Sequence, residues 1–409
     1  MNRLVFAILA VTMMAYTAVA TGGLGVCVTK PLARRTSSGH VVTSNVLKLK
    51  KGKKAAKSSS YLKTLRATSA SNIKRYDYGS VPVVNLLSAE YIAEIAWNGI
   101  QQTNCSFGPP FQGTFDGGAI SNQHFNLMYA DLEFMTGVMG YETVTVAGIT
   151  VEKHQVALVN YTYWFGDSVT SGLMGLAYPR LTSAFVGTNS SVNDDDKQVP
   201  YDPIMTTMIK RGLIEPMFSL VLDRDSENGY LALGGLPPIE LYDDAKVNTE
   251  YSFYTIIADA YIHTSMGSQK TRANTGPWGQ LLQNITVNTT QFPVIVDSGT
   301  TLMYLPTEIY QDILALYNPP AVFSEALASA VTNCNASVPE FGISIGGQVF
   351  MISQADILLQ ASVDPATGSS AVGVMDGGTG PYVLGDTFMN NVISVFDIGA
   401  AEMRFAVNR

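Results

Sequence analysis

Short apolar runs, many with two-residue alternation, dominate the chain from Tyr76 onward. Gly, Pro, Asn and Asp break these runs, and this pattern predicts short β-strands separated by turns. The runs that we expect to form strands cover residues 91–96, 142–151, 155–161, 218–222, 230–233 and 343–352. The pair Gly346-Gly347 interrupts the last run and predicts a tight hairpin turn.

Helical patterns are few. Residues 203–211 predict a short helix that Gly212 closes, and residues 308–316 predict a second helix with its apolar residues on one face. Thr307 is the expected N-cap of the second helix. Many strands and rare helices indicate an all-β fold.

The first residues are typical of a secretory signal. Arg3 supplies the positive charge, residues 4–18 form an apolar run, and Ala18-Val19-Ala20 is a small-residue cleavage site. The run is too short for a convincing membrane anchor, and the C-terminal sequence FAVNR lacks the apolar tail of a lipid anchor. We therefore expect residues 1–20 to be a signal peptide of a secreted protein without a membrane anchor.

The charges are divided unevenly along the chain. Residues 21–75 hold thirteen Lys or Arg and no Asp or Glu, whereas the remainder carries a net charge of −22. This division predicts a removable basic pro-segment that neutralises an acidic body until acid weakens the ion pairs. Lys74-Arg75 is the expected cleavage site, although Arg34-Arg35 is a second dibasic pair. The alternative is a basic arm that binds nucleic acid or a membrane, and the acidic body argues against nucleic acid.

Six N-x-S/T sequons agree with passage through the secretory route. These candidate glycosylation sites begin at Asn104, Asn160, Asn189, Asn284, Asn288 and Asn335. Four scattered histidines show no metal-ligand spacing, and no phosphate-binding glycine loop is present, so we expect neither a metal nor another cofactor. Three cysteines are too few for a disulfide scaffold.

The most informative segment is FPVIVDSGTTLMYLP at residues 292–306. A buried-strand pattern runs directly into a carboxylate there, and burial of a lone carboxylate is costly unless it is hydrogen-bonded or used in chemistry. The segment resembles an active-site loop of the pepsin-like aspartic proteases. The resemblance implies that Asp297 is a catalytic aspartate, that Ser298 braces the two loops of the site, that Gly299 permits the tight backbone, and that Thr300 hydrogen-bonds the carboxylate, with Thr301 completing the loop.

The two halves of the chain also resemble each other. SGLMGLA at residues 171–177 and YVLGD at residues 382–386 match the apolar-apolar-Gly element that crosses behind each active-site loop in this family. The resemblance covers nearly all of residues 76–409 and is strongest to secreted fungal members, through YADLEFMTGVMGYETVTVAGITV. It implies a two-lobed double β-barrel with a central cleft and a few short helices, divided into residues 76–245 and 246–409. It also implies a monomeric endopeptidase that cleaves proteins or peptides at acid pH.

A flap hairpin closes over the substrate in this family, with the pattern Tyr-Gly-x-Gly. The resemblance places Tyr129 and Asp131 in this flap, but Ala130 and Leu132 stand where glycine is expected. Because glycine supplies backbone freedom at those positions, we expect a reshaped flap. The alternative is that Tyr129 is an ordinary strand aromatic.

The first-lobe counterpart of Asp297 is missing from the sequence. After the run at residues 91–96 the family has an apolar strand that ends in Asp-Thr-Gly, but here Ile100 leads directly into QQTNC. Asp116-Gly117-Gly118 follows no buried strand, so we predict a turn there. The family reaction needs two facing carboxyl groups that share a proton, one as base and one as acid. The chain is therefore expected to be inactive.

Three interpretations of this gap remain. The chain is a true inactive relative that binds peptides, or its sequence lacks an exon, or two one-aspartate chains combine in a dimer. The missing piece includes a central strand of the first lobe, and its loss would leave unpaired strand edges and an incomplete core. This consideration favours a missing exon, and the presence of two lobes in one chain argues against the dimer.

Overall fold

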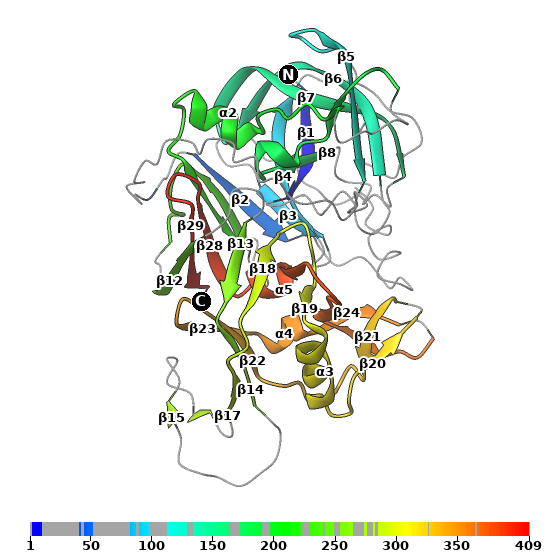
Figure 1. The fold of residues 1–409 in the computed structure, drawn as a ribbon, viewed down its shortest axis with the longest axis vertical. Coiled ribbons are helices and arrows are strands. Elements are labelled where there is room, and N and C mark those ends of the chain that lie inside the picture. The colour runs from blue at the N-terminus through cyan, green and yellow to red at the C-terminus, as the bar shows by residue number, and fades with distance from the viewer. Residues whose placement is uncertain are drawn as a thin grey trace.

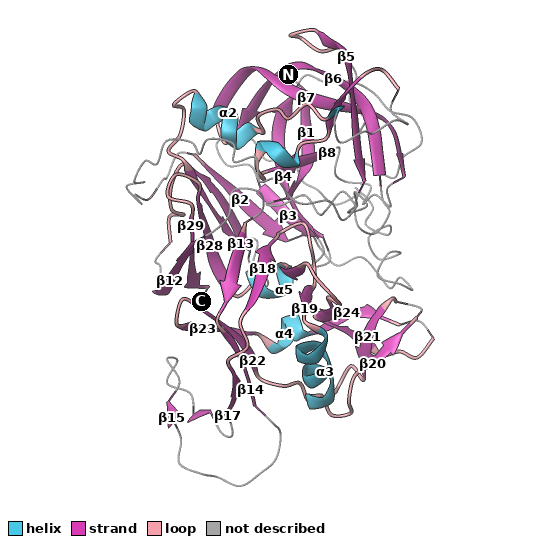
Figure 2. Cartoon of the chain, viewed as in Figure 1, coloured by secondary structure: helices cyan, strands magenta, loops and turns pink. Residues whose placement is uncertain are grey.

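A computed structural model describes residues 2–9, 41, 45–51, 82–86, 90–97, 113–128, 134–163, 172–189, 197–222, 229–239, 242–248, 254–264, 274–275, 281–282, 285–325, 327–364 and 366–408. Strands predominate among them and the helices are short (Figures 1 and 2). The predicted all-β fold class is confirmed. Among the described residues, no helix has the length and apolar character needed to cross a bilayer.

The first lobe occupies the upper part of Figure 1 and consists mainly of antiparallel strands. Its longest strands, β6 and β7, pair along most of their length. Its elements are β1 (Asn2–Leu9), β3 (Pro82–Leu86), β4 (Glu90–Trp97), β5 (Ala119–Met128), β6 (Phe134–Val146), β7 (Ile149–Tyr163), β8 (Gly172–Gly175), the 3-10 helix η2 (Pro179–Leu181), β9 (Ala184–Val186) and α2 (Ile204–Lys210).

A continuous sheet joins the first lobe to the end of the chain. Its strand order is β12-β29-β28-β10-β11-β2-β3-β4-β6-β5-β9, with β1, β7 and β8 attached off this path. Its remaining strands are β2 (Val46–Lys51), β10 (Met217–Val221), β11 (Gly229–Leu233), β12 (Tyr242–Asn248), β28 (Val392–Asp397) and β29 (Glu402–Val407). Strand β2 belongs to the predicted pro-segment, and the predicted lobe boundary at residue 245 falls within β12.

In the described part of the chain, the second lobe contains four smaller sheets and most of the helices. The sheet orders are β13-β18-β27-β19-β26, β17-β14-β22-β23 and β20-β21-β25-β24, and β15 pairs with β16. The bounds are β13 (Thr255–Ala258), β14 (Ala260–Thr264), β15 (Asn274–Thr275), β16 (Leu281–Leu282), β17 (Ile285–Asn288), β18 (Phe292–Val296), β19 (Met303–Leu305), α3 (Thr307–Leu316), β20 (Val322–Ser324), β21 (Ser329–Thr332), β22 (Phe341–Ile345), β23 (Gln348–Ile352), α4 (Gln354–Ile357), β24 (Leu358–Val363), β25 (Ser370–Val372), β26 (Val374–Asp376), β27 (Tyr382–Leu384) and α5 (Asp386–Met389).

An aromatic cluster ties the lobes together. The ring of Phe218 stacks on Phe396 with centroids 4.4 Å apart, and Tyr254 meets Phe396 edge-on at 4.7 Å. All three side chains are fully buried, and each burial stabilises the fold by about 1.5–3 kcal/mol. The Tyr254 hydroxyl also donates to the carbonyl of Leu176, at 2.8 Å, just after β8.

Most of the expected elements are present, with two corrections. Residues 142–151 are not one strand, because β6 ends at Val146 and β7 begins at Ile149, with Ala147 and Gly148 at φ 50° and 79° in a turn. Valines on both sides of this turn, Val146 and Val151 among them, are buried. The apolar pattern therefore continues across the turn, and the sequence suggested a single strand.

Thr307 is also not the N-cap of its helix. Pro306 holds that position, and α3 begins at Thr307. The Thr307 hydroxyl instead donates to the Asp376 carboxylate at 2.7 Å. A residue distant in sequence therefore binds the hydroxyl that was expected to cap the helix. The hairpin between β22 and β23 is confirmed, with Gly346 and Gly347 at φ 57° and 79°, as a type I′ turn requires.

Candidate active site

Asp297 lies at the end of strand β18 and is almost completely buried. β18 is paired on both edges, antiparallel to β13 and parallel to β27. Its sequence FPVIV suits a strand covered on both faces. The pairing carries Asp297 into the interior with a side chain only 1% exposed, where an unpaired carboxylate would be costly.

Both oxygens of the Asp297 carboxylate accept hydrogen bonds from its own loop. The Gly299 backbone N–H donates to Oδ1 at 2.9 Å, and the Thr300 hydroxyl donates to Oδ2 at 2.8 Å. The Asp297 backbone N–H donates to the carbonyl of Leu384 at 3.1 Å, which anchors the loop to β27. Hydrogen bonds to an ionised acceptor are stronger than neutral ones, so the loop offsets part of the cost of burial.

The chain that follows β27 crosses directly behind this loop. The Asp386 N–H donates to the carbonyl of Thr300 at 2.7 Å, and the Thr387 N–H donates to that of Thr301 at 2.9 Å. A Cβ added to Gly385 would lie 2.1 Å from the Thr300 carbonyl oxygen, so only glycine fits the crossing. Ser298, 2% exposed, is buried in the same loop.

Among its described residues, the first lobe contains a similar crossing strand, β8, but no loop like that of Asp297. β8 is parallel to β1, and β1 is antiparallel to β4. Asp116 is exposed in a turn, as predicted, because the Gly118 N–H donates to the carbonyl of Phe115 at 3.2 Å. The sequence contains Asp-Ser-Gly or Asp-Thr-Gly only once, at Asp297.

Several predicted site residues lie outside the described residues. They are Tyr129, Asp131, Lys74, Arg75, Asn104 and Asn284. The described strands β5 and β6 pair antiparallel up to Met128 and Phe134. Their proposed role in a flap stays a prediction.

The four described sequons differ in surroundings. Asn160, Asn189 and Asn335 are exposed, whereas Asn288 is half-buried. The Asn288 side-chain amide donates to the hydroxyl of Tyr261 at 2.9 Å. Its amide nitrogen, which a glycan would occupy, is already engaged in the fold.

The sequence reasoning did not single out Glu142, a buried carboxyl on β6. Its side chain is fully buried, and the Asp116 N–H donates to Oε2 at 3.0 Å, while Oε1 has no partner among the described residues. Burial raises the pKa of Glu142 from 4.5 to about 7. The signal was present in the sequence, because Glu142 is in phase with the buried Val144 and Val146.

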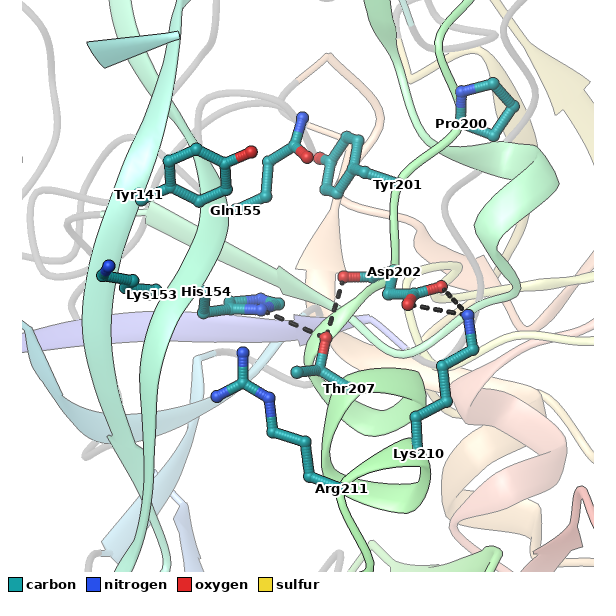
Figure 3. A pocket seen from close by; sticks show the side chains of 10 residues that line it. All are labelled: Tyr141, Lys153, His154, Gln155, Pro200, Tyr201, Asp202, Thr207, Lys210 and Arg211. Atoms are coloured by element: carbon teal, nitrogen blue, oxygen red, sulfur yellow. Dashed lines mark hydrogen bonds and ion pairs between the residues drawn. The ribbon is translucent and has the colours of Figure 1, made fainter. Parts of the chain in front are cut away.

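A pocket of about 340 Å³ lies near Glu142, between β6, β7 and α2 (Figure 3). Its polar groups bind one another: Lys210 pairs with the Asp202 carboxylate at 2.6 Å, and the Thr207 hydroxyl lies 3.3 Å from His154 Nδ1. Burial, with the Arg211 charge nearby, lowers the pKa of His154 from 6.5 to about 4. Because the Thr207–His154 contact joins α2 to β7 and no predicted site residue lines the pocket, we interpret the pocket as part of the packing between α2 and the sheet.

Among the residues described, no three or more His, Cys, Asp or Glu side chains group as metal ligands would. Cys334 is a free thiol. It lies 2.7 Å from the Ser370 hydroxyl in the second lobe.

Comparison with known proteins agrees with this geometry. A family model described as eukaryotic aspartyl protease matches residues 102–408. A probable aspartic-type endopeptidase of Aspergillus fumigatus is 35% identical over 328 residues, which cover 76% of this chain and 69% of that protein. Barrierpepsin of Saccharomyces cerevisiae is 27% identical over 68% of this chain and 45% of its own length.

A solved structure shows the same fold. The crystal structure of an aspartic proteinase from Irpex lacteus superposes with a TM-score of 0.58, at 15% sequence identity. The superposition covers 79% of this chain and 95% of that one.

Proposed function

The chain belongs to the eukaryotic aspartyl protease family, and from this premise we propose that it supplies only one of the two carboxyl groups that peptide-bond hydrolysis needs. The fold is that of an aspartic endopeptidase, and its substrate class is protein or peptide. With this sequence, the chain holds its substrate against Asp297 without cleaving it.

The chemistry explains why one carboxylate is insufficient. The base removes a proton from water, whose oxygen attacks the peptide carbonyl carbon, while a second, protonated carboxyl gives its proton to the carbonyl oxygen. The tetrahedral intermediate then collapses, the C–N bond breaks, and the leaving nitrogen takes a proton. Two like carboxyl groups at close range share one proton and so divide these roles. Asp297 alone is either ionised, and able to act as the base, or protonated, and able to act as the acid. It cannot supply both roles in one reaction.

One observation carries the proposal. In the second lobe a strand, β18, delivers Asp297 into a hydrogen-bonded loop in front of β27. The first lobe has the matching strand β8, but no Asp-Ser-Gly or Asp-Thr-Gly precedes it in the sequence.

The proposal includes processing and export. The sequence pattern supports a signal peptide over residues 1–20 and a basic pro-segment over residues 21–75, cleaved after Lys74-Arg75. The mature body is then a secreted monomer, composed of lobes at residues 76–245 and 246–409. Tyr129 and Asp131 belong to its flap.

The experiment is a gain of function. The purified chain, after removal of the pro-segment, is expected to show no acid proteolysis that pepstatin blocks. A grafted variant receives, between Gly99 and Ile100, the strand and Asp-Thr-Gly loop of an active relative such as the Irpex lacteus proteinase. We expect this graft to cleave protein at acid pH, and Asp297→Asn in the graft to abolish the cleavage. Pepstatin-sensitive activity in the ungrafted chain would refute the proposal.

The second candidate function is peptide binding as an end in itself, by a non-catalytic pseudoprotease. The presence of the complete second-lobe loop beside an absent first-lobe loop favours it. A labelled extended peptide should then bind the ungrafted chain and remain intact by mass spectrometry. Transcript sequencing across residues 99–105 separates the candidates, because a transcript with an additional in-frame Asp-Thr-Gly exon would identify the protein as an active endopeptidase.

A further inference from the structure

Each lobe contains a strand that pairs with an antiparallel strand on one edge and with a parallel strand on the other. In the second lobe β18 lies antiparallel to β13 and parallel to β27. In the first lobe β1 lies antiparallel to β4 and parallel to β8. β1 therefore occupies the position of the strand that carries the catalytic aspartate in the other lobe, although it comes from the N-terminus and not from the segment after β4.

The register makes this equivalence specific. Met174-Gly175 of β8 corresponds to Leu384-Gly385, the apolar-Gly pair at the end of β27. Val296 is opposite Leu384, and Asp297 follows it. In the first lobe Ile8 is opposite Met174, and Leu9 follows it. Leu9 therefore stands at the position that Asp297 holds in the second lobe.

The first lobe depends on this strand. Among the described strands β8 pairs only with β1, whereas its counterpart β27 pairs with both β18 and β19. Ile92 of β4 pairs with Val84 of β3 on one edge and with Ala7 of β1 on the other. Without β1, β8 and one edge of β4 would present unpaired N–H and C=O groups, which attract another strand.

We propose that the space between β4 and β8 is a strand-acceptor site, and that its occupant is the chain's own segment Asn2–Leu9. Recognition is by backbone hydrogen bonding in an antiparallel and a parallel ladder at once, as in β-strand addition. The segment suits the site, because residues 4–9 (LVFAIL) form an uninterrupted apolar run, which is typical of a strand paired on both edges. Removal of the predicted signal peptide opens this site in the mature chain.

The first experiment uses the full chain and amide hydrogen exchange. Ala7→Pro removes an N–H from the middle of β1 and blocks pairing. Exchange at β4 and β8 is then expected to accelerate about tenfold or more, while exchange at β22 and β23 in the second lobe is unchanged. Ala18→Pro, the same substitution outside β1, serves as the matched control. Unchanged exchange at β4 and β8 in the Ala7→Pro chain would overturn the proposal.

The second experiment supplies the strand in trans, and it decides the matter even if Ala7→Pro disturbs the whole fold. A chain that lacks residues 1–20 is mixed with the synthetic peptide of residues 2–9. The peptide is expected to bind one per chain and to restore slow exchange at β4 and β8, whereas the same peptide with proline at position 7 is expected to do neither. Absence of binding would contradict the proposal.

A second copy of the chain is the competing occupant. If the full chain is a dimer in which protection of β4 depends on protein concentration, the strand comes from the partner and the assignment within one chain is wrong. Monomeric full chain with protected β4 at all concentrations supports it.

Discussion

The two lobes reach the same strand arrangement by different routes. In the second lobe the central strand β18 comes from the same part of the chain as its antiparallel neighbour β13, and it ends in Asp297. In the first lobe the central strand β1 comes from the N-terminus, far from β4 in sequence, and reaches Leu9 at the equivalent position. The strand pairing is therefore alike in the two lobes of the full chain, although only the second lobe carries an Asp-Ser-Gly sequence at the end of its central strand.

Strand pairing and catalysis thus make separate demands on the chain. A slot between two strands is satisfied by any extended apolar segment, because the ladder uses backbone groups common to all residues except proline. The position that Asp297 holds instead requires one particular side chain in one place, with donors such as those of Gly299 and Thr300 around it. In the full chain the first lobe meets the first demand through Asn2–Leu9, and the proposed function is that it does not meet the second.

A substitution at the crossing behind the second-lobe loop should be the most damaging. Gly385→Ala places a Cβ 2.1 Å from the Thr300 carbonyl oxygen and 2.5 Å from that of Leu302, and backbone atoms have little room to move. We expect a loss of about 3 kcal/mol in the free energy of unfolding, measured by denaturant titration.

The first lobe provides a matched control for this substitution. Gly148→Ala lies in the β6–β7 turn at φ +79° with nothing within 4 Å of the added Cβ. It should cost only the backbone strain, about 1 kcal/mol. Equal costs for the two substitutions would mean that the Gly385 crossing is not tightly packed.

Loss of a hydrogen bond to Asp297 should cost somewhat less. Thr300→Val removes the hydroxyl that donates to Oδ2 of the buried carboxylate. We expect the free energy of unfolding to fall by about 2 kcal/mol, measured at neutral pH. Thr300→Ser keeps the hydroxyl and should lose much less. If serine and valine cost the same, the methyl group and not the hydrogen bond stabilises the loop.

A smaller, pH-dependent effect belongs to the first lobe alone. The folded state favours protonated Glu142, whose pKa is raised from 4.5 to about 7. The stability from this carboxyl is complete below pH 4.5 and is lost as the pH rises through 7. Glu142→Gln removes the titration, so the variant should become more stable than the parent chain as the pH rises above 7.

Thermal unfolding at several pH values tests this prediction, with hydrogen exchange at β6 and β7 as the probe of the first lobe. His154, opposite Glu142 in the β6–β7 pair, has its pKa lowered from 6.5 to about 4, and its contribution is lost as the pH falls through that range. The stabilities of the variant and the parent chain are therefore compared above pH 7, where His154 is neutral in both. A Glu142→Gln chain with the pH dependence of the parent would show that Glu142 does not titrate as its burial requires.

Glycosylation should change the stability least. Asn335 and Asn160 are exposed, and we expect them to carry glycans after secretion from a fungal host. Asn288 should stay unmodified, because its amide donates to Tyr261. Peptide mass spectrometry before and after deglycosylation measures the occupancy. Removal of the glycans should change the free energy of unfolding by less than about 0.5 kcal/mol. A glycan on Asn288 would show that the glycan is added before β14 and β17 pair.

The sequence predicted the local features of this protein well. The hairpin at Gly346-Gly347, the helix α2 and the strands β10 and β11 follow from turn chemistry and apolar periodicity. The loop at Asp297 was also visible, because its donors at Gly299 and Thr300 lie two and three residues away. Where local preference competed with a distant partner, prediction was wrong, as at Thr307, whose hydroxyl bonds Asp376.

The family, the all-β class and the single Asp-Ser-Gly loop could be predicted from the residues alone. Each of them depends on short stretches of neighbouring residues, whose pattern is visible in the sequence. Which segment lies between β4 and β8, where Glu142 is buried, and how tightly Gly385 crosses behind Thr300 are properties of the packed chain. Each of these depends on backbone and side-chain groups brought together from distant parts of the sequence, and strand pairing uses hydrogen-bonding edges that many segments share.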